Sequence, residues 1–197
     1  MDTNTKTQLR CYGIPGNLVS CDFSNFRINS NNTDAAISCR LFAFSKLTKG
    51  QGLIISGPPN SGKSHLAVAT LRNIVLSYKR QPIQESTLYI SARQFLKIRS
   101  LDSQSIEKSP LLRNAYECQL LLLEDFGSEI SSEWSFGELL YLISSRYNNL
   151  LRTIITSRLS PNDIFSHYFR KAINPLSVDK LLFRFDSGYC STTILGC

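Results

Sequence analysis

One eight-residue segment has the composition and spacing of a phosphate-binding loop. It matches the pattern GxxxxGK[ST] and reads Gly57-Pro58-Pro59-Asn60-Ser61-Gly62-Lys63-Ser64. Backbone N–H groups in such a loop converge on the β- and γ-phosphates of a nucleotide. Lys63 would add a positive charge there, and the hydroxyl of Ser64 could ligate Mg²⁺. The segment therefore predicts a site for a nucleoside triphosphate with magnesium.

The flanks of this loop are those that a phosphate site needs. The apolar run at residues 53–56 predicts a buried strand, and residues 65–76 predict a helix. Strand, glycine-containing loop and helix in that order is the context that supports the motif. Gly62 lets the backbone come close, and Asn60 is the non-glycine type best able to take a left-handed conformation. An ordinary turn that contains Gly and Lys by chance is the weaker alternative.

Two adjacent carboxylates, Glu124 and Asp125, end a run of four leucines. Such an unalternated apolar run predicts a central parallel strand that is covered on both faces. A carboxylate at the end of this strand could hold Mg²⁺, and its neighbour could orient or deprotonate an attacking water. We assign the metal to Glu124 and the water to Asp125. The alternative is that acids follow the strand only because the chain leaves the core there.

The remaining chain alternates between strand and helix patterns. Strands are expected at residues 87–91, 119–125, 152–157 and 189–195, and helices at 33–47, 92–99, from 111, 134–149, 162–169 and 177–185. This alternation predicts an α/β fold of the P-loop type, with a central parallel sheet flanked by helices on both faces. We expect residues 1–10 to be disordered, 11–50 to be a lead-in segment that packs on the core, and 51–197 to be the core of a single domain.

Composition limits the environment and the partners. No apolar run approaches the roughly 18–20 residues that span a bilayer, and the polar N-terminus lacks a signal core, so we expect no membrane contact and a cytoplasmic protein. The six cysteines form no CxxC pair, which favours thiols over a zinc site. The net charge of +7 suits contact with a phosphate backbone, although it fits a solvated basic surface equally well.

With both elements in hand, the chain resembles the DnaC/IstB-type branch of the AAA+ ATPases, which are bacterial helicase loaders and transposition helper ATPases. The resemblance covers residues 11–197. It is carried by the lead-in Gly13-Ile14-Pro15 with Cys21-Asp22-Phe23-Ser24-Asn25-Phe26, the phosphate loop through His65-Leu66-Ala67, the strand end Leu121-Leu122-Leu123-Glu124-Asp125-Phe126-Gly127, and Arg146-Tyr147 followed by Thr153-Ile154-Ile155-Thr156-Ser157.

The resemblance implies ATP and Mg²⁺ as cofactors and hydrolysis of ATP to ADP and phosphate. It also implies a homo-oligomer formed with ATP, single-stranded DNA as a ligand, and a replicative helicase or a transposase as partner. Arg184 matches the arginine that family members offer to a neighbouring subunit's nucleotide, which makes it catalytic in trans beside Glu124 and Asp125. His65 falls within the matched loop and joins residues 57–64 in the predicted nucleotide-binding set; packing or solvation suits it better than catalysis.

Three departures from the family's pattern bear on turnover. The first acid, usually Asp, is Glu124; the γ-phosphate sensor, commonly Asn, is Arg158; and the acid that often precedes the trans arginine is Phe183. The chain also ends without the family's later arginine and begins without a loader's N-terminal domain. A nucleotide-responsive binding module with little or no turnover is therefore the second hypothesis. A small-molecule kinase is a third, which the adjacent acids and the lack of an Arg-rich lid disfavour.

The basic side chains that could meet nucleic acid fall mostly in the second quarter of the chain. We predict that DNA contacts come from this set: Arg72, Lys79, Arg80, Arg93, Lys97 and Arg99. Helix ends and exposed faces carry such charges in any protein, so each residue alone is weak evidence.

Overall fold

Five short segments rich in Leu, Ile, Thr and Ser form the sheet at the centre of the molecule. The computed structural model describes residues 3–44, 52–77, 86–101, 109–128, 132–160, 163 and 190–194. Within these ranges the strands are β1 (Gly52–Ser56), β2 (Thr87–Ser91), β3 (Leu120–Phe126), β4 (Arg152–Ser157) and β5 (Cys190–Ile194). All pairings are parallel, in the order β2-β3-β4-β1-β5. The C-terminal ends of β1 and β3 therefore meet at one edge of the sheet, with only β4 between them.

The leucine run in β3 is buried on both sides, as an unalternated apolar strand should be. Leu120 and Leu122 belong to one hydrophobic cluster, and Leu121 and Leu123 belong to the other. Because successive side chains of a strand point to opposite faces, this single strand contributes to both cores. The prediction of a central, doubly covered strand is confirmed.

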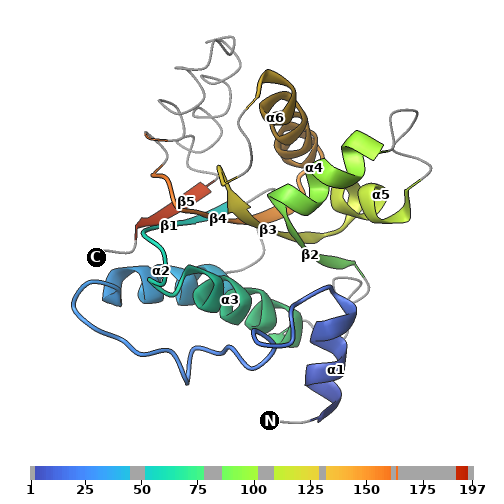
Figure 1. The fold of residues 1–197 in the computed structure, drawn as a ribbon. Coiled ribbons are helices and arrows are strands. Elements are labelled where there is room, and N and C mark those ends of the chain that lie inside the picture. The colour runs from blue at the N-terminus through green and yellow to red at the C-terminus, as the bar shows by residue number, and fades with distance from the viewer. Residues whose placement is uncertain are drawn as a thin grey trace.

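Helices cover both faces of the sheet (Figure 1). The helices are α1 (Thr3–Cys11), α2 (Thr33–Phe44), α3 (Lys63–Ser77), α4 (Ala92–Leu101), α5 (Pro110–Glu117) and α6 (Glu133–Asn148). In Figure 1, α2 and α3 lie below the sheet, and α4, α5 and α6 lie above it. This arrangement confirms the predicted α/β fold with helices on both faces.

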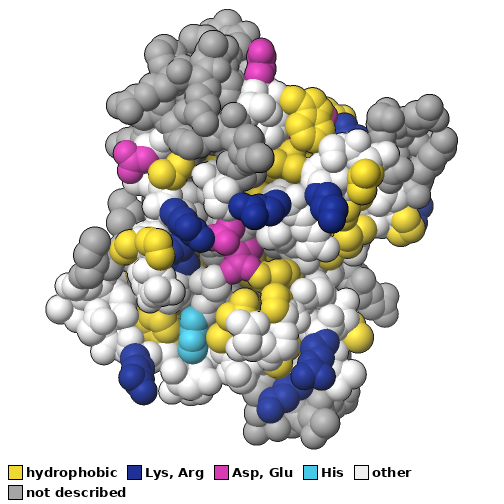
Figure 2. Space-filling model, in the orientation of Figure 1, with side chains coloured by type: hydrophobic (Ala, Val, Ile, Leu, Met, Phe, Trp, Pro, Cys, Tyr) yellow, Lys and Arg dark blue, Asp and Glu magenta, His cyan; other side chains and the backbone are white. Residues whose placement is uncertain are grey.

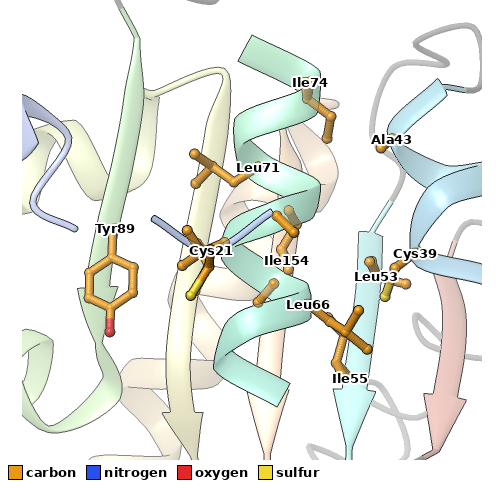
Figure 3. Packing of buried hydrophobic residues seen from close by; sticks show 14 of the residues in the cluster. Cys21, Cys39, Ala43, Leu53, Ile55, Leu66, Leu71, Ile74, Tyr89 and Ile154 are labelled. Carbon is orange, nitrogen blue, oxygen red and sulfur yellow. The ribbon is translucent and has the colours of Figure 1, made fainter. Parts of the chain in front are cut away.

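The hydrophobic cluster below the sheet in Figure 1, here called the lower core, packs α3 against β1, the strand that precedes it. Figure 3 shows Leu66 of α3 near Ile55 of β1, and Cys39 of α2 beside Leu53 of β1. Leu66, Ile55 and Cys39 have no exposed surface at all. Packing of this density holds the start of α3 in place, and the start of α3 is where the phosphate loop ends.

Two local expectations differ from the structure. Residues 1–10 were expected to be disordered, yet α1 is a helix because Leu9, 2% exposed, inserts into the lower core. In α2, helical spacing in the sequence favours a buried apolar face of Ala36, Ile37, Leu41 and Phe44; Ala36 is buried, but the other three side chains are exposed. Small residues instead face the core, namely Ala35, Ala36, Cys39 and Ala43, together with Phe42. Small side chains let α2 approach α3 closely, which a face of larger residues would prevent.

The expected strands and the helices between residues 63 and 148 are present, with ends within a few residues of prediction. Residues 45–47 of the first expected helix and almost all of the two helices expected at 162–169 and 177–185 lie outside the described residues. Among the described helices, none combines the length and apolar character that crossing a bilayer requires.

A fully buried arginine fixes the beginning of β4. The guanidinium of Arg146, on α6, donates to the hydroxyl of Thr153 at 2.9 Å and to the carbonyls of Ala115, Cys118 and Arg152 at 2.9, 3.0 and 2.5 Å. Burial lowers the pKa of Arg146. The acceptors come from α5, the segment before β3 and β4, so one side chain ties together three parts of the upper layer.

Candidate nucleotide site

The phosphate loop closes between the end of β1 and the start of α3. The N–H of Gly57 donates to the carbonyl of Ser157 on β4 at 3.2 Å, which anchors the loop to the sheet. The hydroxyl of Ser61 donates to the carbonyl of Pro58 at 2.8 Å. Asn60 has a φ of 63° and Gly62 a φ of 94°, so the expected left-handed conformation of Asn60 is present. The loop thus directs the first N–H groups of the 15-residue helix α3 outward from the sheet edge.

Lys63 is only 7% exposed and points into this loop. Its ammonium donates to the carbonyl of Pro58 at 2.5 Å. Burial lowers the pKa of Lys63; the charge of Asp125 raises it, that of Arg158 lowers it further, and that of Glu124 raises it. A phosphate is a far stronger acceptor than a carbonyl for an ammonium, so an anionic ligand would stabilise the charged form of this side chain.

An irregularity in β3 gives the paired acids their positions. The register between β3 and β4 shifts between Leu123 and Phe126, and Asp125 has a φ of 56°. Its N–H donates to the hydroxyl of Thr156 at 3.0 Å. In a regular strand, adjacent side chains would point to opposite faces; a bulge re-aims one of them. Here both Glu124 and Asp125 lie within electrostatic range of Lys63.

Glu124 is buried, at 9% exposure, and meets the end of the phosphate loop. Burial raises the pKa of Glu124, the hydrogen bond with the Ser64 side chain lowers it, the charge of Asp125 raises it and that of Lys63 lowers it. Mg²⁺ prefers oxygen ligands and is held by one or two carboxylates together with phosphates. The Ser64 hydroxyl and the Glu124 carboxylate, already joined by a hydrogen bond, are oxygens of that kind. The residues therefore fit the predicted cation, whose charge would offset the cost of burying Glu124.

Two adjoining cavities lie around the loop. One of about 360 Å³ is lined by Lys63, Ser64, Asp125 and Arg158, and another of about 710 Å³ lies between the loop and residues 25–32. They share Pro59, Asn60, Gly62 and His65. Their sizes fall in the range of small-molecule sites. Figure 2 shows acidic side chains at the centre of this face, with Lys and Arg side chains on either side.

The lead-in segment packs directly against the phosphate loop. A Cβ at Gly62 would lie 2.7 Å from Cε2 of Phe26, so glycine is required there by Phe26 as well as by its φ. Phe26 also meets the ring of His65 edge-on at 5.2 Å, and Nε2 of His65 lies 2.9 Å from the carbonyl of Asp22. The carboxylate of Asp22 in turn pairs with Arg72 of α3 at 3.3 Å.

The structure thus brings together most of the residues that the sequence singled out. The loop, Lys63, Ser64, Glu124 and Asp125 form one site, and His65 borders both cavities while it packs on Phe26. Arg184 lies outside the described residues. Sequence reasoning assigned no role to Phe26 in the site; the only signal for it was its place in the lead-in motif. Nor did it foresee that Arg158 lies beside Asp125.

Solved structures of replication proteins resemble this chain closely in fold. The crystal structure of the DnaC helicase loader matches with a TM-score of 0.73 at 24% identity, covering 92% of this chain and 99% of that one. The crystal structure of DnaI matches with a TM-score of 0.68 at 19% identity, covering 92% of this chain and 94% of that one. The chain therefore shares the fold of DnaC and DnaI.

A replication initiator also shares this fold. DnaA bound to AMPPCP and single-stranded DNA matches with a TM-score of 0.64 at 19% identity, over 88% of this chain and 49% of that one. No protein-family model and no curated protein matches the chain. At these identities the likeness is one of fold, and it confirms the predicted resemblance at that level.

Proposed function

We propose that this chain is an ATP-binding AAA+ protein that assists DNA replication in the manner of a helicase loader. One observation carries the proposal: Lys63 and Ser64 of the phosphate loop line one cavity with Asp125, and Glu124, beside Asp125 at the end of β3, hydrogen-bonds with the Ser64 side chain. A triphosphate needs cations and backbone N–H groups, and its magnesium needs buried oxygen ligands. The fold shared with DnaC and DnaI supports a role in replication, and a role in transposition stays the alternative.

Each residue would have one task in hydrolysis. Lys63 and the loop N–H groups would hold the β- and γ-phosphates, and Ser64 with Glu124 would hold Mg²⁺, which neutralises the charge on the phosphates. Asp125, with a carboxylate 43% exposed in the cavity, would orient the attacking water. Arg184 would stabilise the transition state at a neighbouring subunit's nucleotide.

The decisive experiment compares ATP affinity in the whole chain and in Lys63→Ala by isothermal titration. We expect wild-type binding to require Mg²⁺ and the variant to lose it. Equal affinities would remove the foundation of the proposal. Steady-state phosphate release, with Asp125→Asn as the matched variant, then measures turnover.

DNA contact is proposed at a surface groove between α4 and the start of α6. A cavity of about 560 Å³ there is lined by Arg93 and Lys97 of α4 and by Trp134 of α6, whose side chain is 48% exposed. Cations that track a backbone and an aromatic face that stacks on bases are the usual elements of a single-strand site. The DnaA structure that shares this fold was solved with single-stranded DNA.

Two of the six basic residues predicted to contact DNA form ion pairs within the protein. Arg72 pairs with Asp22, and Arg99 forms a two-pronged pair with Glu138 at 2.7 and 2.9 Å, so both are engaged within the protein. Lys79 and Arg80 lie outside the described residues. Fluorescence anisotropy with a labelled single strand tests the groove: Arg93→Ala/Lys97→Ala should lose affinity and lower the salt dependence, and Arg113→Ala on α5 should not. Equal binding by all three proteins would exclude the groove.

One specific observation favours the alternative function, a nucleotide-responsive binding module with little or no turnover. Arg158 stands where the family commonly has an asparagine, and a guanidinium has no acceptor with which to polarise water. Phosphate release with and without single-stranded DNA separates a hydrolase from a module that only responds to nucleotide. Light scattering after size-exclusion chromatography, without nucleotide and with ATP, tests the expected homo-oligomer and the role of Arg184 together. Cytoplasmic location and the choice of helicase partner remain predictions.

A further inference from the structure

A compact turn of the lead-in segment stands beside the phosphate loop. The carboxylate of Asp22 accepts from the N–H of Ser24 at 2.9 Å, and the carbonyl of Asp22 accepts from the N–H of Asn25 at 3.3 Å. The side-chain amide of Asn25 accepts from the N–H of Asp22 and donates to the carbonyl of Ser20, both at 2.9 Å. These reciprocal bonds fix the backbone of the turn, so Phe26, the next residue, projects from a preformed base.

The turn is fastened to both helices of the lower layer. The Asp22 carboxylate pairs with Arg72 of α3 at 3.3 Å, and the Asp22 carbonyl lies 2.9 Å from Nε2 of His65, also on α3. Arg40 of α2 donates to the carbonyl of Phe23 at 3.2 Å. The position of the turn is therefore set by α2 and α3, and not by the glycine-containing part of the loop.

From this turn, the ring of Phe26 reaches the last glycine of the phosphate loop. A Cβ built on Gly62 would lie 2.7 Å from Cε2 and 3.2 Å from Cζ of Phe26, so the edge of the ring occupies the space beside the Gly62 backbone. The carbonyl of Gly62 accepts from the N–H of Leu66 at 3.0 Å, which makes Gly62 the point where the loop becomes helix. A glycine has more backbone freedom than any other residue, and here a ring restricts it.

We propose that Phe26 is a positioning residue: its ring holds Gly62, and with it the first N–H groups of α3, in the conformation that receives the phosphates. This inference rests on the proposed function, because it concerns the phosphates that this loop would bind. Ordering a backbone costs conformational free energy. A loop that is ordered before its ligand arrives binds more tightly, because that cost is not subtracted from the binding free energy.

A positioning role and a direct contact with the nucleotide differ in one measurable way. Phe26 also lines the cavity of about 710 Å³, which has room for a nucleoside. If the ring contacts the nucleoside, its removal weakens ATP binding and spares tripolyphosphate, which has three linked phosphates but no base or sugar. If the ring positions the loop, both ligands lose affinity by the same factor.

The test measures affinities of the full chain for ATP and for tripolyphosphate, each with Mg²⁺, by isothermal titration. Phe26→Ala should weaken both on the order of tenfold, which is about 1.4 kcal/mol and similar to the cost of fixing the backbone of one residue. Phe26→Leu, which keeps an apolar side chain against Gly62, should recover part of both affinities.

Leu18→Ala is the matched control for lost packing. Like Phe26, Leu18 is a partly buried apolar side chain packed against the lower core, but it is not among the described residues that line the two cavities. Urea denaturation should show that Leu18→Ala and Phe26→Ala lose similar stability, whereas only Phe26→Ala should lose affinity. If Phe26→Ala does not fold, Phe26→Leu takes its place in the same comparison.

A double-mutant cycle tests whether the turn acts through Phe26. Asp22→Ala removes the pair with Arg72 and the bond from Ser24, so it should loosen the turn and weaken both ligands, by less than Phe26→Ala does. In the Phe26→Ala background the same substitution should have little further effect, because the turn then no longer reaches the loop. Fully additive losses would show that the turn acts on the site without Phe26, against the proposal.

The remaining outcomes separate the positioning role from the nucleotide site itself. A loss of ATP affinity alone in Phe26→Ala, or no loss for either ligand, would overturn the positioning role. So would a wild-type protein that binds ATP but not tripolyphosphate, since a loop shaped by the protein should hold phosphates without a nucleoside. Equal ATP affinities of Lys63→Ala and wild type would instead overturn the nucleotide site, whatever Phe26 does.

Discussion

The two ends of β4 each involve an arginine, and the two arginines do opposite things. Arg146 belongs to α6, and its guanidinium lies at the beginning of β4. It has no exposed surface, and its contacts are carbonyl groups, the Thr153 hydroxyl and the Cys118 thiol. Arg158, just after the end of the strand, is 55% exposed and has one distant carboxylate partner. The first is locked by acceptors that cannot move, and the second is available to a ligand. The same residue type is structural or functional according to what surrounds it.

The sharpest way to test this contrast is to remove each arginine and measure stability. Arg146→Met would leave the carbonyls of Ala115, Cys118 and Arg152 buried without their donor, so we expect a loss of at least about 3 kcal/mol in the free energy of unfolding. Arg158→Ala should change it by less than about 0.5 kcal/mol. Urea denaturation followed by circular dichroism measures both. Similar losses in the two variants would remove the distinction.

Lys63 can be compared with the two arginines, because it is a buried cation whose proposed partner is the bound nucleotide. Burial lowers the pKa of Lys63, so its charge costs stability in the folded protein without a ligand. Lys63→Ala should therefore keep or slightly raise the melting temperature while it weakens ATP binding about a hundredfold. Calorimetry with and without Mg-ATP measures both effects. A variant that unfolds at a much lower temperature would show that Lys63 is structural, as Arg146 is.

Glu124 is a buried acid whose charge, like that of Lys63, costs stability in the folded protein without a ligand. Its folded-state pKa is raised, so the folded protein binds more protons than the unfolded chain as the pH passes upward from the ordinary value of 4.5. Its contribution to stability is fully present below pH 4.5 and is lost as the pH rises through the raised pKa. Glu124→Gln should flatten that slope and raise the free energy of unfolding at neutral pH without nucleotide, measured by urea titration across pH. It should also weaken binding of Mg-ATP. An unchanged slope would contradict the placement of Glu124.

The pair of Arg99 with Glu138 is intermediate between Arg146 and Arg158 in exposure, and we expect an intermediate effect on stability. Both side chains are 18% exposed and meet in a two-pronged geometry at 2.7 and 2.9 Å. Removing the pair by Arg99→Ala should cost about 1 kcal/mol, less at high salt. Thermal unfolding at low and high ionic strength measures it. A loss as large as that of Arg146→Met would mean that burial does not order these three arginines.

Much of the site could be predicted from local sequence. The loop at residues 57–64 has a short-range pattern in which spacing alone brings N–H groups and a lysine together. The run into Glu124 is equally local, because four leucines followed by acids mark a buried strand and its end. The parallel sheet followed from the alternation of strands and helices. These features could be predicted because each depends only on residues that are neighbours in the chain.

Other features could not be predicted, because they depend on residues far apart. Leu9 stabilises α1 only because it packs into the lower core. The face of α2 that carries mostly small side chains is buried only because α3 lies against it. Gly62 needs to be glycine partly because Phe26 packs on it from 36 positions away. The pair of Arg158 with Asp125 exists because β3 and β4 end side by side, with a bulge in β3.

The sequence by itself determined which groups would do chemistry: a loop of N–H donors with a lysine, a hydroxyl, and two acids after a buried strand. Only the tertiary structure decided which of many charges face that site, because β4 lies between β1 and β3 and brings Arg158, the residue just after its end, to their shared edge. Local patterns encode backbone conformation and residue type. The partners of a charge are set by which strands lie next to one another, and no short segment contains that information.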